Sequence, residues 1–98
     1  MNEKITDKQI QDWKKKHGEI FKIEFEDGKS IYLKKPTRQV LKLAMTMLQT
    51  DPLRMVETII KNCQLGGDNI EGNDSYLFGA STQIDKIIEI KQAELKKL

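Results

Sequence analysis

Few residues in this chain are of the types that carry catalytic chemistry, and none has a partner beside it in the sequence. His17 is the single histidine and follows Lys14-Lys15-Lys16 at the end of a predicted helix. A general base needs a positioned partner and a pocket, so we interpret His17 as a solvent-facing or helix-dipole residue. Cys63, the single cysteine, lies on an apolar helical stripe, where a thiol behaves as a small hydrophobic group. We expect no catalytic residues and no enzymatic activity.

The segment from Gly66 to Asp74 is rich in oxygen-bearing side chains and glycine. A calcium loop places oxygen donors at alternating positions before its glycine and a Glu after it. Here Ile70 occupies a donor position and the closing Glu is absent. Gly66-Gly67 also lacks the Lys-Ser/Thr step that follows in a phosphate-binding loop. We therefore predict turns and helix capping in this loop, with no metal and no cofactor.

A local basic patch runs from the end of a predicted strand into the following helix: Lys34, Lys35, Arg38 and Lys42. These side chains could contact phosphates or an acidic partner, or form a solvated rim around the core. The whole chain holds 17 Lys and Arg against 15 Asp and Glu, a net charge of +2. General nucleic-acid and membrane-surface binders usually carry a larger basic excess. The near balance of charge therefore argues against either as the partner.

The elements that position these residues form one predicted α+β domain, residues 1–98. A capping box of Thr6 and Gln9, and a stop at Gly18, predict an N-terminal helix within residues 1–18. Residues 19–35 alternate apolar and polar side chains, as in an antiparallel β-hairpin. Residues 37–98 then form a predicted three-helix bundle.

The register of the hairpin depends on the length of its turn. A two-residue turn at Asp27-Gly28 would place Ile31 and Leu33 on the opposite face from Phe21 and Ile23. A three-residue loop that includes Glu26 instead pairs Ile23 with Ile31 and Phe21 with Leu33, so all four share one face. We predict this longer loop, with Gly28 in a left-handed conformation.

Capping signals divide the bundle into three helices. Thr37 begins the first, which we expect to reach about Thr50, and Asp51-Pro52 begins the second, which we expect to reach Cys63. Gly66 to Asp74 is then a predicted loop. The last helix is expected to begin near Ser75 and continue to the C-terminus, and its predicted buried face comprises Leu77, Ala80, Ile84, Ile87, Ile88 and Leu95.

Residues 40–48 form the least polar helix, because Lys42 and Thr46 alone interrupt the apolar side chains. A helix that is apolar nearly all round is either central in the core or partly exposed to a partner. In the second case Leu43, Met45 and Met47 would contact the partner, since methionine adapts to varied apolar surfaces. A seam on the last helix leaves a homo-oligomer open as well, and its residues are Ile84, Ile88, Lys91, Leu95 and Leu98.

Three segments resemble small phage or prophage proteins of the tail assembly chaperone type: residues 31–38 (Ile-Tyr-Leu-Lys-Lys-Pro-Thr-Arg), 62–68 (Asn-Cys-Gln-Leu-Gly-Gly-Asp) and 91–98 (Lys-Gln-Ala-Glu-Leu-Lys-Lys-Leu). The resemblance lies in a hairpin that leads through a Lys-Pro-Thr-Arg step into a helical bundle, and it spans the chain from about Gly18 onward. It implies a non-enzymatic protein that keeps apolar segments of the tape-measure protein soluble until the tail tube assembles. Lys34, Lys35 and Arg38 would be available to the same partner. The alternative is a small nucleic-acid-associated regulator of a phage or mobile element.

The expected compartment is the cytoplasm, of the host cell if the protein is phage-encoded. A single cysteine suits a reducing environment. Met1-Asn2-Glu3-Lys4 lacks the apolar stretch of a signal peptide. Val40 to Leu48, the longest apolar stretch, is shorter than the ~20 residues that span a bilayer, so we expect no membrane partner.

Overall fold

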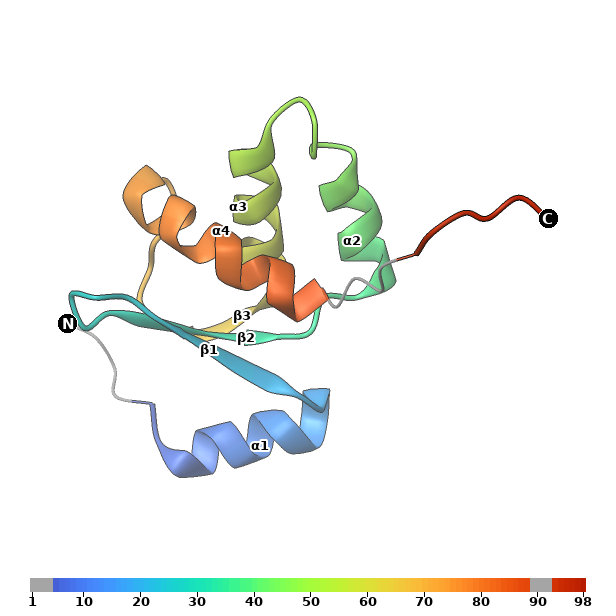
Figure 1. The fold of residues 1–98 in the computed structure, drawn as a ribbon. Coiled ribbons are helices and arrows are strands. Elements are labelled where there is room, and N and C mark those ends of the chain that lie inside the picture. The colour runs from blue at the N-terminus through green and yellow to red at the C-terminus, as the bar shows by residue number, and fades with distance from the viewer. Residues whose placement is uncertain (1–4, 89–92) are drawn as a thin grey trace.

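In the computed structural model, which describes residues 5–88 and 93–98, an antiparallel sheet carries helices on both faces (Figure 1). The strand order is β1-β2-β3, so β2 is central. Helices α2, α3 and α4 lie on one face and α1 on the other. This arrangement confirms the predicted α+β class. In chain order the elements are α1 (Asp7–His17), β1 (Ile20–Glu24), β2 (Ser30–Lys34), α2 (Arg38–Met45), α3 (Pro52–Cys63), β3 (Gln64–Gly67) and α4 (Asp74–Ile88).

The hairpin of β1 and β2 has the predicted register. Ile23 pairs with Ile31 and Phe21 with Leu33. The Phe25 N–H donates to the Lys29 carbonyl at 2.8 Å, which closes a three-residue loop. Gly28 has a φ of +91°, a left-handed value that glycine adopts without steric cost. The side chains of Phe21, Ile23, Ile31 and Leu33 therefore share the face that carries α2, α3 and α4.

The helices begin at the predicted caps. The Thr6 hydroxyl accepts the Gln9 N–H at 3.2 Å and completes a capping box. Thr37 accepts the Val40 N–H at 3.3 Å. Asp51 caps α3, whose first residue is a proline. Each cap satisfies an N–H that has no partner within the helix.

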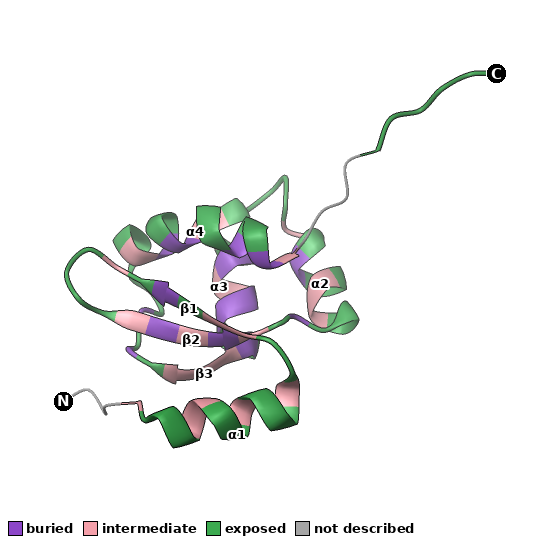
Figure 2. Cartoon of the chain, turned by 60° about the horizontal axis from the view of Figure 1, so that its bottom comes forward, coloured by how far each residue is buried: buried purple, intermediate pink, exposed green. Residues whose placement is uncertain are grey.

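The hydrophobic core lies between the sheet and the three helices on its inner face (Figure 2). β1 and β2 contribute side chains from alternate positions, while α3 and α4 contribute helical stripes. Within the described residues, no helix is both long enough and apolar enough to cross a bilayer. The buried core residues are Ile23, Ile31, Leu33, Ala44, Met55, Val56, Ile59, Ile60, Cys63, Ile70, Leu77, Ala80, Ile84 and Ile87.

Strand β3 replaces the start of the predicted 66–74 loop, so that part of the prediction was wrong. Its Gly67 pairs with Ile31 of β2, and Gly66 pairs with Tyr32. Gly-Gly is typical of loops because glycine weakens strands. Here, however, the missing side chains let Trp13 lie close to Gly66 and the Ser30–Ile31 backbone lie close to Gly67. A Cβ atom on Gly67, which has a φ of +100°, would lie 2.5 Å from the Ser30 carbonyl oxygen.

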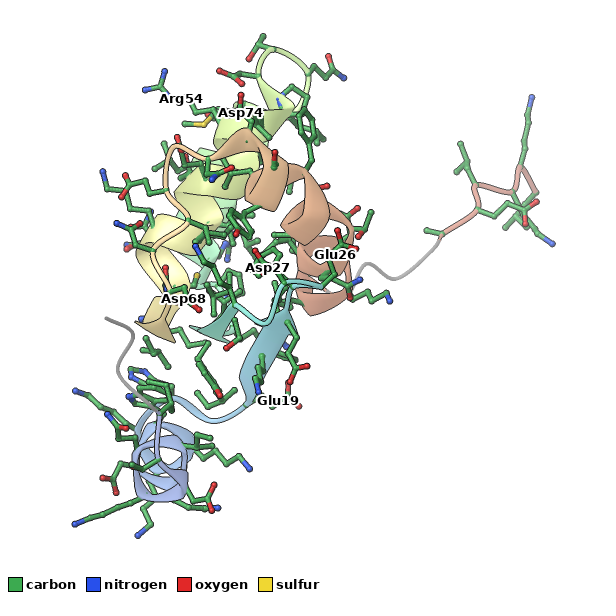
Figure 3. All side chains as sticks on the ribbon, turned by 90° about the vertical axis from the view of Figure 1, so that its left-hand side faces the viewer. Glu19, Glu26, Asp27, Arg54, Asp68 and Asp74 are labelled. Atoms are coloured by element: carbon green, nitrogen blue, oxygen red, sulfur yellow. The ribbon has the colours of Figure 1, made fainter. Side chains whose placement is uncertain are left out.

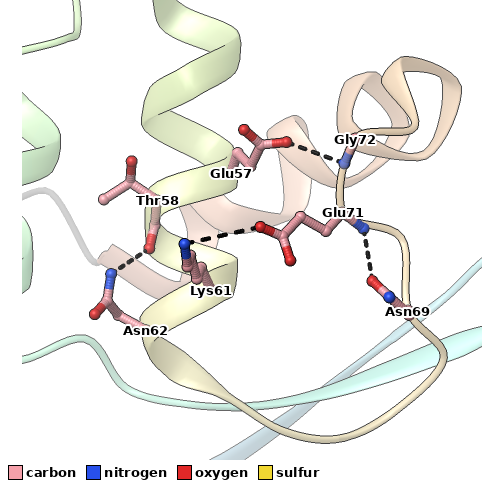
Figure 4. A network of polar contacts seen from close by, with 7 residues as sticks. All are labelled: Glu57, Thr58, Lys61, Asn62, Asn69, Glu71 and Gly72. Carbon is pink, nitrogen blue, oxygen red and sulfur yellow. Dashed lines mark hydrogen bonds and ion pairs between the residues drawn. The ribbon is translucent and has the colours of Figure 1, made fainter.

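The rest of the loop is anchored to β2 and α3. The Ser30 N–H donates to the Asp68 carboxylate at 2.8 Å. Asn69 accepts the Glu71 N–H at 3.0 Å, and the Gly72 N–H donates to Glu57 of α3 at 3.1 Å (Figure 4). The oxygen-bearing side chains of this segment therefore form turns and tertiary anchors.

Helix α2 ends at Met45, earlier than the predicted Thr50. The Thr46, Met47 and Leu48 N–H groups donate to carbonyls three residues back, the tighter pattern of a 3₁₀ turn. The Thr46 hydroxyl also donates to the Leu43 carbonyl at 2.6 Å. This side-chain bond competes with the regular α-helical pattern and accompanies the change in winding.

The last helix also ends earlier than predicted. α4 is described from Asp74 to Ile88, and residues 93–98 have no regular structure and extend away from the fold (Figure 1). Leu95 is 97% exposed, so its predicted place on the buried face was wrong. Residues 93–98 are all exposed, so no part of the chain that the structure describes covers an apolar stripe on this tail, and helices in proteins depend on such packing. Lys91 of the predicted seam lies outside the described residues.

Candidate protein-binding surface

The two residues considered for catalysis occupy different parts of the fold. Cys63 is fully buried on α3, and this burial raises the pKa of its thiol, with a smaller opposing effect from Lys34. A protonated, buried thiol is a poor nucleophile. His17 is half-buried at the end of α1, on the other side of the sheet. The structure does not bring these two residues together.

Helix α2 is covered along one face and open along both flanks. Ala44 is fully buried, and Val40 and Met47 pack against the core from the same side. Met47 also accepts a hydrogen bond from the Thr58 hydroxyl at 3.5 Å. Leu43 and Met45, on either side of this inner face, are 51% and 41% exposed. Of the three predicted contact residues, Leu43 and Met45 are exposed, whereas Met47 is half-buried against the core.

An apolar groove of about 290 Å³ lies between α4 and the start of α3. Leu48, one turn after Met45, forms one wall and is 46% exposed. Phe78 of α4 forms the opposite wall and is 65% exposed. Ser81 and Asp85 of α4 are the polar members of a lining completed by Pro52, Leu53, Met55 and Val56. We call this feature the apolar groove.

The predicted basic residues lie elsewhere. Lys34 is half-buried at the end of β2, while Lys35 and Arg38 are exposed between β2 and the first turn of α2. None of the three lines the apolar groove. The buried Pro36 separates the strand from the helix and fixes their connection. The structure therefore places the predicted apolar and basic residues on different parts of the α2 region.

Phe78 was not among the predicted site residues. It falls outside the predicted buried stripe of α4, whose members Leu77, Ala80 and Ile84 are indeed buried. An aromatic residue that lies off a helical apolar stripe is the sequence signal that could have identified it. Leu48 was part of the apolar stretch, but its position on the groove depends on the turn that follows α2.

Comparison of the sequence with protein-family models gives no match, and comparison with curated proteins gives none either. Among solved structures, the fold is similar to that of uncharacterised protein rbstp2171 from Bacillus stearothermophilus. The two structures superpose with a TM-score of 0.65 and 14% sequence identity, over 90% of this chain and 99% of the other. Likeness at this identity shows a shared fold alone.

Proposed function

We propose that this chain is a non-enzymatic protein-binding domain whose apolar groove receives an apolar helix of a partner protein. In its most specific form it is a cytoplasmic tail assembly chaperone that shields apolar segments of a tape-measure protein. The observation that carries the proposal is the exposure of Phe78 and Leu48 on facing walls of the groove, at 65% and 46%. Large apolar side chains gathered around a hollow are typical of protein-interaction sites.

A helix is the occupant that suits this groove best. Its walls come from α4 on one side and from the start of α3 with the preceding turn on the other. An amphipathic helix presents anchoring side chains at intervals of three and four residues, which can fill such a groove one after another. Met45, three residues before Leu48, is also exposed, and its flexible thioether can adapt to different anchors.

The chaperone form of the proposal draws on the resemblance of residues 31–38 and on the arrangement around α2. Leu43 and Met45 offer apolar contacts on both flanks of that helix. Lys35 and Arg38 are exposed near its first turn, and charged side chains there would help to keep a complex with an apolar segment in solution. Binding would cover the partner's apolar stripe without any chemical step.

The test measures binding of a synthetic apolar helix from a tape-measure protein by calorimetry. We expect Phe78→Gln and Leu48→Gln each to weaken binding by at least about tenfold, the loss typical of a central apolar anchor. Leu95→Gln is the matched control, because it makes the same chemical change on the 97%-exposed tail. It should leave affinity unchanged. Unchanged affinity in both groove variants would overturn the proposed site.

Salt dependence separates this proposal from the nucleic-acid alternative. Apolar docking should change little between low and high salt, whereas phosphate-driven binding weakens steeply. Tight binding of an oligonucleotide, lost in high salt and in an Arg38→Gln variant, would contradict a purely protein-binding role.

In the chaperone form, co-expression should also raise the soluble fraction of a fused tape-measure segment, and the Phe78→Gln variant should lose this effect.

A further inference from the structure

Strand β1 leaves one edge of the sheet open. It pairs with β2 on one side, and no other strand within the described residues pairs with its outer edge. The Phe25 N–H bonds to Lys29 of the returning chain. In an antiparallel strand, the N–H and C=O groups of successive residues point alternately to one side and the other. Because those of Phe25 point toward β2, those of Lys22 and Glu24 point to the open edge. Such an edge is ready to accept another strand unless something covers it.

Here the edge is bordered by a groove. Two adjoining hollows of about 480 and 660 Å³ run between β1 and α4, and they share Glu24 and Gly79. Four consecutive strand residues, Phe21 to Glu24, line the first hollow, opposite Gln83 and Lys86 of α4. Gly79 lines both hollows, and a Cβ atom at this position would lie 3.7 Å from the Phe25 ring. We call this feature the edge groove.

The edge groove is separate from the apolar groove. Phe78, Ser81 and Asp85 line the apolar groove on one side of α4, whereas Gly79, Gln83 and Lys86 line the edge groove on the other. A partner helix on Phe78 therefore leaves β1 free. Figure 3 shows the hairpin turn, with Glu26 and Asp27, beside α4 at one end of this edge.

We propose that the edge groove receives β1 of a second copy of this chain, with the two strands antiparallel about a two-fold axis at Ile23. In this register Lys22 lies opposite Glu24 of the second copy, and Glu24 opposite the second Lys22. Phe21 lies opposite the second Phe25. Opposite charges and aromatic residues that face each other across antiparallel strands are favourable pairs, and the symmetry repeats each of them.

The neighbouring register is unfavourable, which makes the choice specific. A two-fold axis at Lys22 would place the two Lys22 side chains opposite each other, and like charges in that position are destabilising. In the register at Ile23, the outward backbone groups of Lys22 and Glu24 form a hydrogen-bonded pair, as the ladder requires. In this register, two copies of β1 are therefore complementary in side-chain charge and in backbone hydrogen bonding.

The charges needed for this pairing are already at the surface. Lys22 and Glu24 form an ion pair of 2.7 Å within one chain, and their side chains are 44% and 69% exposed. In the dimer, Lys22 and Glu24 of the second copy join this pair, so that each charge lies next to charges of opposite sign. Exposed ion pairs contribute little stability, so their role here is to select the register, while backbone pairing and coverage of the half-buried Phe21 and Phe25 hold the dimer.

Light scattering over a concentration series tests this dimer, with two charge-reversal variants. We expect Lys22→Glu and Glu24→Lys each to raise the dimer dissociation constant by at least about tenfold, because each places like charges opposite each other. An equimolar mixture of the two variants should restore dimerisation, since every facing pair is then of opposite sign. If a substitution instead weakened dimerisation by disturbing the fold of its own chain, mixing the two variants would not restore the dimer.

Lys15→Glu is the matched control, because it reverses the same charge on the exposed face of α1. It should dimerise as the wild type does, and it should not rescue Glu24→Lys on mixing. Circular dichroism checks that each variant keeps its fold. A wild-type chain that stays monomeric up to about 1 mM would overturn the proposal, as would restoration of dimers by the Lys15→Glu control.

Discussion

The two faces of the sheet are built in different ways. The inner face carries the core, and Ile31, Leu33, Leu77 and Ile84 are all at most 1% exposed. The outer face carries α1, of which no residue from Asp7 to His17 is buried. Apolar stabilisation scales with the area removed from water. The inner face therefore supplies most of the stability of this fold, and α1 is an attached element.

An aromatic contact joins α1 to the outer face of the sheet. Trp13 lies tilted against Tyr32 of β2, with ring centroids 5.8 Å apart. A Cβ atom on Gly66 would lie 2.9 Å from the Trp13 ring, so this glycine allows the indole to rest on β3. The comparison teaches that one sheet can be tightly packed on one face and carry, on the other, a helix that has no buried residue.

The largest effect should come from the inner face. Replacing Ile84 with Ala removes buried methyl groups and leaves a cavity, which costs about 2–5 kcal/mol of unfolding free energy at such sites. Chemical denaturation measures the loss. Gln83→Ala, at the exposed neighbouring position on α4, is the control and should stay within about 0.5 kcal/mol of wild type. Equal losses in both variants would contradict the comparison.

A smaller, local effect is expected on the outer face. Trp13→Ala removes the main contact of α1, so its amide protons should exchange with solvent much faster. The amides of β2 and α4 should keep most of their protection, because their packing does not depend on α1. Hydrogen exchange followed by mass spectrometry resolves the two regions. Lys15→Ala on the exposed face of the same helix should change neither region, and loss of protection throughout would show that both faces unfold together.

The smallest effect concerns a polar contact at the rim of the inner face. The Tyr76 hydroxyl donates to the Asp27 carboxylate, and this bond, with a backbone N–H from Lys29, lowers the pKa of Asp27 below its usual 3.8. A lowered pKa in the folded state contributes stability at neutral pH that is lost as the pH falls through that folded-state pKa.

Tyr76→Phe should therefore lower the melting temperature slightly at pH 7. The gap between variant and wild type should close on acidification below pH 3.8, the usual pKa of this carboxyl. Thermal melts at a series of pH values measure this gap. Ser75→Ala, at the preceding exposed position, should follow the wild-type curve. Because the variant keeps the aromatic ring that packs on Phe25, a gap of constant size at every pH would show that the hydroxyl does not act through the charge of Asp27.

Local signals explain how much of the fold could be predicted from the sequence. The hairpin register follows from the alternation around Ile23 and Ile31, and the helix starts follow from caps within a few residues. β3 could not be predicted, because Gly67 belongs to a strand only through its close approach to Ser30, far away in the chain. The apolar groove was not predicted either, and none of the predicted contact residues Leu43, Met45 and Met47 lines it. The apolar character of residues 40–48 is a local signal, whereas Phe78 joins Leu48 only after α4 has packed.

The position of β2 in the middle of the sheet has a consequence for synthesis on the ribosome. Its Ser30 bonds to Asp68, 38 residues later, and at about 5–20 residues per second this delay lasts roughly 2–8 seconds. Ile31 and Leu33 are made at the start of that interval, before α3, β3 and α4, which complete the sheet and cover its inner face. The apolar face of the hairpin therefore stays uncovered until the later elements of the chain have been made.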